Sequence, residues 1–418
     1  MLTSLQTAIS GMNANGTNLS VIADNIANLN TVGFKKSTVV FGDVLSGTLT
    51  GVAGSAQVGR GVYVQKVSPM FSQGPLETTE NSLDMAIDGD GFFIVRDRGA
   101  VFYTRAGRFD IDKDGFIVNA AGLTLQGYQA DPAGNLTGTI GDLQLLVTQN
   151  QARLTGNALM SVNLDGNAQI PPVAFTLDSN GDGVLNDPTG YNSSTTLTVF
   201  DSQGGAHQIT LYYEKTAPNT WNIHYVQADP ANPGQLLWAG AQEVTFDTAG
   251  VQIGVTGADP VFNFGAAVVQ PQTITFDHTG TTQNKSEFAV LNNDQDGYAS
   301  GSLSRLVITG NGIMTGIFTN GQTRVIGQVV LARFVAPTEL IKLGGNLYGE
   351  STKSGQPIVS APTTSGLGDV VPNTIELSNV DLAQEFINMI SAQRGFQANS
   401  RVVTTTDELL IEVVNLKR

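Results

Sequence analysis

The C-terminal segment from Ser378 to Arg418 most strongly constrains the fold, because it carries a long helical pattern that no proline interrupts. Ser378 is the expected N-cap, with Asp381 completing a capping box. A helix from Val380 to Leu416 would be about 55 Å long. Apolar, small and amide side chains recur there in alternating steps of three and four, at Met389, Ala392, Phe396, Asn399, Val403, Thr406, Leu410 and Val413. This spacing keeps one stripe of side chains on the same face of the helix. Because many members of the stripe are small or amide side chains, the helix would not be stable alone and needs a partner to pack against.

The N-terminal segment has the same alternation, at Leu5, Ile9, Met12, Gly16, Leu19, Ile22 and Ile26. Between Met1 and Asn28 the only charged residue is Asp24. A solvated helix normally carries a charged face, so this uncharged polar surface predicts packing against copies of the same chain. The two terminal helices therefore predict a polymerisation module. Its candidate contact residues are Leu5, Ile9, Met12, Leu19, Ile22, Ile26, Leu382, Phe386, Met389, Phe396, Val403, Leu410 and Val413.

Composition and charge exclude several classes of partner and site. Asp and Glu number 36 against 21 Lys and Arg, and the net charge of −15 argues against nucleic acid and anionic membranes as main partners. The chain has no cysteine, so it has no disulfide, thiol nucleophile or cysteine metal site. No apolar run approaches the roughly 20 residues of a membrane span. The N-terminus lacks the features of a secretory signal, so we expect a cytoplasmic protein or one exported without a cleavable signal.

The sequence between the helices is predicted to be mainly β. A glycine-rich region after the first helix is read as an extended, partly β linker, with hinge candidates Gly33, Gly47, Gly51, Gly54 and Gly59. Asp114-Gly115 between apolar alternations predicts a hairpin, and Asn311-Gly312 predicts another. From about Thr148 the sequence becomes rich in Asn, Thr and Gly. Short strands are expected in this region at Thr196–Phe200, Gln208–Tyr213, Trp221–Val226 and Thr273–Phe276.

These patterns predict a multidomain, mainly β protein with nested, discontinuous β domains of barrel or sandwich type and a terminal α-helical, coiled-coil-like domain. Similar hairpins on both sides of the Asn/Thr-rich region indicate one β domain interrupted by another. The predicted parts are a helical domain (1–30 with 373–418), an extended linker region (31–75 with 356–372), a split β domain (76–148 with 296–355) and an inserted β domain (149–295).

One loop resembles a calcium site. Asp178, Asn180 and Asp182 occupy positions 1, 3 and 5 of a calcium loop, with glycine at position 6. Position 12, which should hold a bidentate glutamate, is Thr189, and no helical pattern flanks the loop. The alternative is a polar Asx/Gly turn. No other cofactor is expected.

The sequence contains no catalytic motif that we recognise. His207, His224 and His278 stand singly in β-type sequence, without metal-ligand spacing or a nucleophile nearby. The chain also lacks a nucleophile elbow, a Walker loop and a dinucleotide-binding fingerprint. We therefore expect that the protein is not an enzyme.

Two long motifs resemble the bacterial flagellar rod and hook axial proteins. They are the N-terminal Asp24–Lys35 segment, DNIANLNTVGFK, and the C-terminal Ser378–Ser400 segment, SNVDLAQEFINMISAQRGFQANS. Three shorter segments, at Ile87–Phe93, Asp296–Leu303 and Asn320–Gln328, resemble the hook branch of this family. The resemblance covers roughly 1–148 and 296–418. One departure is Gly395, which stands before Phe396 where many relatives carry a larger residue.

The resemblance implies a structural subunit that assembles helically into the flagellar hook, a universal joint between rod and filament. It also implies export without a cleavable signal through the flagellar type III apparatus to an extracellular position. Implied partners are further copies of the chain, the distal rod protein, the hook-capping protein and the hook–filament junction protein. On this reading the terminal helices form the inner tube, and uncharged side chains such as Asn13, Asn15, Asn18 and Gln393 re-pair as neighbours shift.

Three alternatives remain open from the sequence. The first is a distal rod-type axial protein of the same family, which would be similar at both ends. The second is a secreted β-rich protein that binds calcium or acts in adhesion, and the third is an enzyme. Electron microscopy of the purified protein, in search of tubes, would separate the assembling proteins from the other two classes.

Overall fold

A computed structural model describes residues 2–45, 59–131, 133–145 and 149–415 of the chain. The chain divides into two compact units. Unit 1 comprises Met1–Leu146, Arg305–Ile317 and Thr323–Arg418, and unit 2 comprises Val147–Ser304 and Phe318–Gln322. The mainly β fold with terminal helices and more than one β domain is the predicted one. None of the helices in the described ranges is long and apolar enough to cross a membrane.

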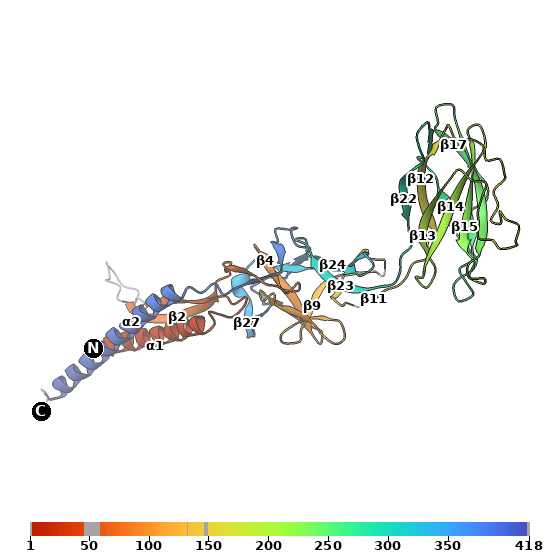
Figure 1. Ribbon diagram of the computed structural model, residues 1–418. Coiled ribbons are helices and arrows are strands. Elements are labelled where there is room, and N and C mark those ends of the chain that lie inside the picture. The colour runs from red at the N-terminus through yellow and green to blue at the C-terminus, as the bar shows by residue number, and fades with distance from the viewer. Residues whose placement is uncertain (1, 46–58, 132, 146–148, 416–418) are drawn as a thin grey trace. The chain divides into compact units, whose positions relative to one another are not determined.

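Two long helices, α1 (Leu2–Ala27) and α2 (Leu382–Asn415), lie side by side in unit 1 (Figure 1). They run antiparallel, since Gly11 of α1 contacts Asn399 of α2 while Asn25 bonds to Glu385. The predicted N-cap at Ser378 is wrong. α2 begins at Leu382, and Asp381 caps it by accepting hydrogen bonds from Ala383 N at 2.9 Å and Gln384 N at 3.1 Å.

The region predicted as an extended, partly β linker, 31–75, contains a pair of strands. Strands β1 (Ser37–Leu45) and β2 (Gly59–Pro69) pair antiparallel into a ribbon. The ribbon lies against α1, where Ser10 Oγ accepts a hydrogen bond from Val62 N at 3.2 Å. The second predicted linker, 356–372, also holds paired strands. β29 (Ile358–Ser360) pairs with β26 (Leu331–Arg333), and β30 (Asp369–Pro372) pairs with β4 (Met85–Asp88). Strands β29 and β30 are only three or four residues long and lie within Pro-, Gly- and Ser-rich sequence, so the sequence pattern does not reveal them.

The β domain of unit 1 is built on a large sheet whose central order is β25-β9-β5-β6-β28-β27. One of its core clusters is aromatic and aliphatic, and includes Phe92, Tyr103, Phe334 and Tyr348. The elements of this domain are β3 (Leu76–Thr78), β4 (Met85–Asp88), β5 (Phe92–Asp97), β6 (Ala100–Thr104), β7 (Phe109–Ile111), β8 (Ile117–Asn119), β9 (Thr124–Ala130), β10 (Leu136–Asp142), β24 (Ile313–Phe318), β25 (Thr323–Val329), β26 (Leu331–Arg333), the 3-10 helix η1 (Pro337–Glu339), β27 (Ile341–Gly344), β28 (Leu347–Gly349), β29 (Ile358–Ser360), β30 (Asp369–Pro372) and β31 (Thr374–Glu376).

Both predicted hairpins of this domain are confirmed. β7 pairs with β8 across the Asp114-Gly115 turn, where Asp112 Oδ1 accepts hydrogen bonds from Asp114 N and Phe116 N. β23 (Gly301–Ile308) neighbours β24 across the turn that contains Gly312, whose φ of +76° suits glycine. The segments before and after the Asn/Thr-rich region thus contribute to one sheet.

Unit 2 is a β-sandwich-like domain. A five-stranded antiparallel sheet, β13-β14-β15-β16-β17, packs on a second sheet in which β12 pairs with β20, β21 and β22. One core cluster joins the two, with Met160 and Val162 from β12 packed near Trp221 and Tyr225 from β15. The strands are β11 (Gln149–Asn150), β12 (Asn157–Asp165), β13 (Ser193–Phe200), β14 (Ala206–Ala217), β15 (Thr220–Ala228), β16 (Leu236–Phe246), β17 (Gln252–Thr256), β18 (Val261–Phe262), β19 (Gln272–Thr273), β20 (Thr275–Asp277), β21 (Thr282–Asn284) and β22 (Ala289–Gln295).

Candidate assembly interface of the terminal helices

The two terminal helices meet at a pair of glycines. A β-carbon on Gly11 would lie 2.8 Å from Asn399 Nδ2, and one on Gly395 would lie 3.0 Å from Asn15 Oδ1. Each asparagine also donates its amide to a carbonyl of its own helix, Asn15 to Gly11 O at 2.8 Å and Asn399 to Gly395 O at 2.9 Å. Because glycine has no side chain, the two helix backbones can approach closely at these positions. The amide of each asparagine, held against its own helix, fills the space opposite the glycine of the other helix.

Asn25 fixes the far end of the helix pair. Its side chain is buried, accepts a hydrogen bond from Ser37 N at 2.9 Å and donates to Ser37 O at 2.9 Å. It also donates to Glu385 Oε2 of α2 at 3.3 Å. One amide thus connects α1, the start of the β1–β2 ribbon and the first turn of α2, so these three elements hold a fixed geometry.

The predicted contact residues are not all on the face that the two helices bury against each other. The residues with the lowest exposure are Ala8, Ala14, Ile22 and Asn25 on α1, and Glu385, Ala392 and Thr406 on α2. Seven predicted residues are half-buried, namely Leu5, Met12, Leu19, Ile26, Met389, Val403 and Leu410. Four others are exposed, namely Ile9, Leu382, Phe386 and Phe396. The side chain of Val413 lies outside the described residues.

Large apolar side chains cover the outer surface of α2. Phe386 is 48% exposed, Ile387 is 61% exposed and Leu409 is 57% exposed. Ile390, Phe396, Val402 and Ile411 are exposed as well. Isolated exposed apolar residues are ordinary, but a helix that presents so many of them has the character of an interaction surface. We call these seven α2 side chains the outer apolar face.

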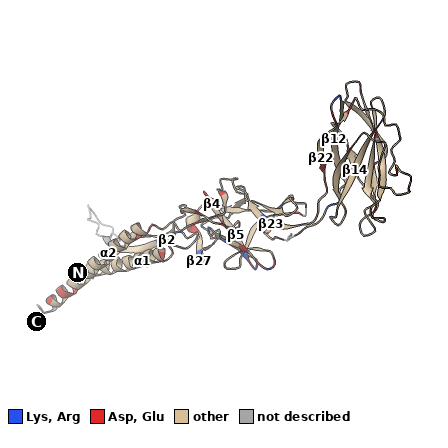
Figure 2. Cartoon of the chain, viewed as in Figure 1, with Lys and Arg blue, Asp and Glu red and all other residues tan. Residues whose placement is uncertain are grey.

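Charge is sparse on α1, where Asp24 is the one charged residue, whereas α2 carries six charged residues, namely Glu385, Arg394, Arg401, Asp407, Glu408 and Glu412. Figure 2 shows few charged residues along α1 and α2, with acidic residues towards the C-terminal end of α2. α1 has no acidic residue in its first turn and no basic residue in its last turn. The seven residues of the outer apolar face therefore share the surface of α2 with exposed charged side chains such as Arg394, Arg401 and Glu408.

A buried ion cluster joins the helical end of the chain to the β domain within unit 1. Lys35 Nζ lies 2.6 Å from Glu376 Oε1, and both side chains are fully buried. Arg105 NH1 lies 3.5 Å from Glu376 Oε2, and Lys35 Nζ also donates to Ser72 O at 2.7 Å. Burial lowers the pKa of Lys35, while the charge of Glu376 opposes that change. Burial likewise lowers the pKa of Arg105. Glu376 thus compensates two buried cations.

The predicted hinge glycines fall in different surroundings. Gly33 is buried, has a φ of +68°, and donates its N–H to Glu376 O at 2.7 Å. A β-carbon there would lie 2.5 Å from Ala106 N, so the backbone at Gly33 is tightly packed. This packing argues against a hinge at Gly33. Gly47, Gly51 and Gly54 lie outside the described residues, and Gly59 begins β2.

The candidate calcium loop in unit 2 is closed by its own hydrogen bonds. Asp178 accepts from Gly181 N at 2.7 Å and from Gly183 N at 3.0 Å. Asn180 Oδ1 accepts from Asp182 N, and Asp182 Oδ1 accepts from Val184 N. This is the geometry of the alternative Asx turn. Within the described ranges, no group of three or more His, Asp or Glu side chains is placed to hold a metal ion. The hydrogen bonds favour the turn over the calcium site, and a calcium titration distinguishes the two.

The three histidines are separate from one another. His207 Nε2 lies 2.7 Å from Asp201 Oδ2, and His224 Nε2 lies 2.8 Å from Glu214 Oε2. His278 is buried, with Nε2 2.7 Å from the hydroxyl oxygen of Tyr225, and burial lowers its pKa to about 4. Each histidine has a structural partner in the β-sandwich.

The predicted stripes contained Ile22, Ala392, Asn399 and Thr406, which lie at the helix pair, but sequence reasoning missed the contact roles of Gly11 and Gly395 and the whole ion cluster. A signal for the helix pair is present, because α1 contains Gly-Met-Asn-Ala-Asn at 11–15 and α2 contains Gly-Phe-Gln-Ala-Asn at 395–399. In both helices an asparagine follows a glycine by four residues, and these are the residues that meet where the helices cross. Lys35 and Glu376 stand 341 residues apart, and no local pattern links them.

Comparison with known proteins places the chain in a family. Matching family models are "Flagella basal body rod protein" at 5–35, "Flagellar hook protein FlgE/F/G D1 domain" at 86–186, "Flagellar basal body protein FlaE D2 domain" at 163–298 and "Flagellar basal body rod FlgEFG protein C-terminal" at 371–416. The flagellar hook protein FlgE of Escherichia coli K12 is 34% identical over 415 residues, which cover 98% of this chain and 99% of that protein. The chain belongs to the flagellar hook protein family.

Other hook proteins match at similar levels. The FlgE of Borreliella burgdorferi is 32% identical over all of both chains, and that of Salmonella typhimurium is 32% identical over 99% of this chain and all of its own length. A crystal structure of Helicobacter pylori FlgE2 covers 70% of this chain and 98% of its own, at 16% identity and a TM-score of 0.50. This likeness supports the fold. The relatives match the whole chain, including unit 2, so the rod-type alternative is not favoured.

Proposed function

We propose that this chain is a structural subunit that assembles helically, through its terminal helices, into the flagellar hook. The observation that carries the proposal is the outer apolar face of α2, a set of large exposed apolar side chains on a terminal helix of a hook-family chain. In an assembly these side chains would lose their exposure to water, which contributes about 25 cal/mol for each Å² of apolar surface buried.

The mechanical role follows from the same features. The packed α1–α2 pair would give each subunit a stiff rod, and its apolar outer face would bind neighbouring copies along the inner tube. The polar surfaces of the β domains would slide past one another as a subunit passes from the inner to the outer side of a bend. The assembly would thereby work as a universal joint that transmits torque from rod to filament.

The proposed partners follow from the family. Besides other copies of the chain, they are the distal rod protein, the hook-capping protein, the hook–filament junction protein and the type III export apparatus. The proposed location is extracellular, in the hook, after export without a cleavable signal peptide. A purely structural role, without catalysis or cofactor, is part of the same proposal.

Electron microscopy of the purified chain tests the assembly. The wild-type protein should form tubes, and Phe396→Asp should prevent them, because it places a charge in the outer apolar face. Ile253→Asp is a matched control, since Ile253 is 67% exposed but lies on β17 of unit 2. Tubes from Phe396→Asp as abundant as those from the wild type would show that the helices are not the joint between copies.

A further inference from the structure

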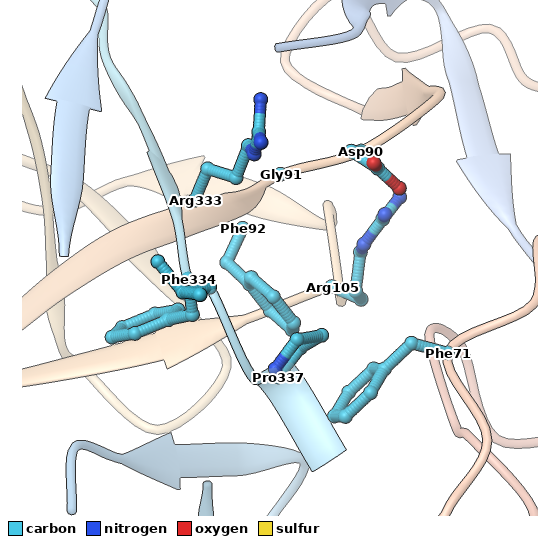
Figure 3. Close-up of a pocket in the computed structure, with 9 residues that line it drawn as sticks. Phe71, Asp90, Gly91, Phe92, Arg105, Arg333, Phe334 and Pro337 are labelled. Atoms are coloured by element: carbon cyan, nitrogen blue, oxygen red, sulfur yellow. The ribbon is translucent and has the colours of Figure 1, made fainter. Parts of the chain in front are cut away.

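The β domain of unit 1 contains a pocket of about 190 Å³ that the helix interface does not use. It lies where β5 begins, beside the segment that leads from β26 to η1 (Figure 3). Its floor is aromatic. The rings of Phe71 and Phe92 pack edge to face at 5.1 Å, and Phe92 and Phe334 do so at 6.0 Å. Aromatic rings packed in this way give a rigid apolar base.

Two guanidinium groups belong to the lining. Arg105 is 2% exposed, and its Nη2 donates to Gly89 O at 2.7 Å. Its buried Nε has no hydrogen-bond partner among the described residues, so one donor of this buried cation is unsatisfied. Arg333 extends from the end of β26, and its Nη1 donates to Ser365 O at 3.1 Å. Asp90 also lines the pocket, and Glu376 lies behind Arg105, so the arginines are only partly compensated.

The rim of the pocket is apolar and open to solvent. Val335 is 80% exposed, the highest exposure of any large hydrophobic side chain that the structure describes. Pro337 lies beside it in the lining. An aromatic floor, an exposed aliphatic rim and arginines together are the features of an anchor site at a protein–protein interface.

We propose that this pocket receives an acidic side chain from the β domain of a second copy of the chain. The chemistry favours a carboxylate, because guanidinium groups bind carboxylates through charge-assisted hydrogen bonds, and the apolar floor accommodates its aliphatic stem. A second copy fits this chemistry, since the chain carries 36 acidic residues and a net charge of −15. The inference rests on the proposed assembly and adds a contact between β domains to the contact between helices.

Zero-length coupling with a carbodiimide tests the contact directly. Arg333→Lys places an amine at the pocket, and the reagent joins an amine to a carboxylate only when they touch. The full-length variant is assembled from an equal mixture of ¹⁵N-labelled and unlabelled copies, and the cross-linked peptides are identified by mass spectrometry. We expect links between position 333 and an Asp or Glu of the other isotope in assembled protein and not in monomers. The control is Arg98→Lys, whose position is on the same domain with the native side chain 94% exposed.

A second pair of variants tests the rim. Val335→Asp should raise the critical concentration for assembly at least tenfold. Val101→Asp, on the exposed side of β6 in the same domain, should change it less than twofold. Both sites are exposed, so the melting temperatures of the monomers should match that of the wild type. Failure of Arg333→Lys to assemble, with Arg98→Lys assembling normally, would likewise support the pocket.

The outcomes separate the two proposals. If tubes form but position 333 couples only within its own copy, or if Val335→Asp assembles like Val101→Asp, the pocket proposal is wrong and the helix interface stands. If the wild-type chain forms no tubes, the proposed function fails and this inference fails with it.

Discussion

Gly11 of α1 lies directly against the side chain of Asn399 of α2, so that a β-carbon at position 11 would be 2.8 Å from Asn399 Nδ2. The reciprocal contact, Gly395 against Asn15, is made one turn away. This exchange of glycine and asparagine is what allows two helices with few large side chains between them to pack within one subunit.

Filling the crossing should separate the helices. Gly11→Ala forces Asn399 to move, and we expect the helix pair to lose about 1–3 kcal/mol of stability, as overpacked sites do. Gly16→Ala is the matched control, because nothing lies within 4 Å of a β-carbon there, and alanine should stabilise α1 by up to about 1 kcal/mol. Thermal unfolding of helix, followed by circular dichroism, measures both. Equal effects of the two variants would contradict the close crossing.

Removing the Asn25 side chain should loosen the junction of helix and ribbon. Asn25→Ala leaves the buried N–H and C=O of Ser37 without their partners, at a cost of about 1–3 kcal/mol for each unsatisfied group. Asn13→Ala, at an exposed position of the same helix, should have almost no effect. Amide hydrogen exchange at Ser37 reports the change, and unaltered protection in Asn25→Ala would show that the amide does not hold the junction.

Neutralising Glu376 should destabilise unit 1 selectively. Glu376→Gln leaves Lys35 and Arg105 buried without their counter-charge, and breaking such an arrangement costs about 3–5 kcal/mol. Denaturant unfolding, with Trp221 and Trp238 reporting on unit 2, should show that unit 2 is unaffected. Glu339→Gln, which removes a solvent-accessible partner of Lys66, serves as the control and should produce no measurable change.

The stability of unit 2 should fall in acid because of His278. Its pKa in the folded state is lowered to about 4, so the unfolded chain binds the proton more readily. The contribution of His278 to the free energy of unfolding is therefore complete above the ordinary pKa of about 6.5. About 3 kcal/mol of it is lost as the pH falls from there towards 4. His278→Gln should lack this part of the pH dependence, whereas His207→Gln should retain it. Parallel stability curves for the wild type and His278→Gln would contradict a neutral buried imidazole.

The candidate calcium loop needs a separate measurement. Its carboxylates already accept backbone hydrogen bonds, so we expect 1 mM Ca²⁺, a concentration on the order of that bound by extracellular modules, to leave the melting temperature of unit 2 unchanged. Asp178→Asn is the comparison. A calcium-dependent rise in the wild type that this variant abolishes would establish the site.

The sequence predicted the elements whose signals are local. Periodicity placed both terminal helices to within three residues, and turn chemistry placed the hairpin at Asp114-Gly115. It did not predict which helix face is buried, because glycine, alanine and asparagine carry the contact while Phe386 and Phe396 remain exposed. The Lys35–Glu376 pair was also missed. It depends on chain segments that only the folded structure brings together.

The antiparallel pairing of α1 with α2 has a consequence for the order in which a subunit matures. Residues 11 and 399 come from opposite ends of the polypeptide, so the first helix has no companion until the final segment has emerged. Local β hairpins, which close over a few residues, are free to form long before then. The surface that we propose to join one copy to the next is therefore completed last, and a truncated chain should be unable to enter the proposed assembly.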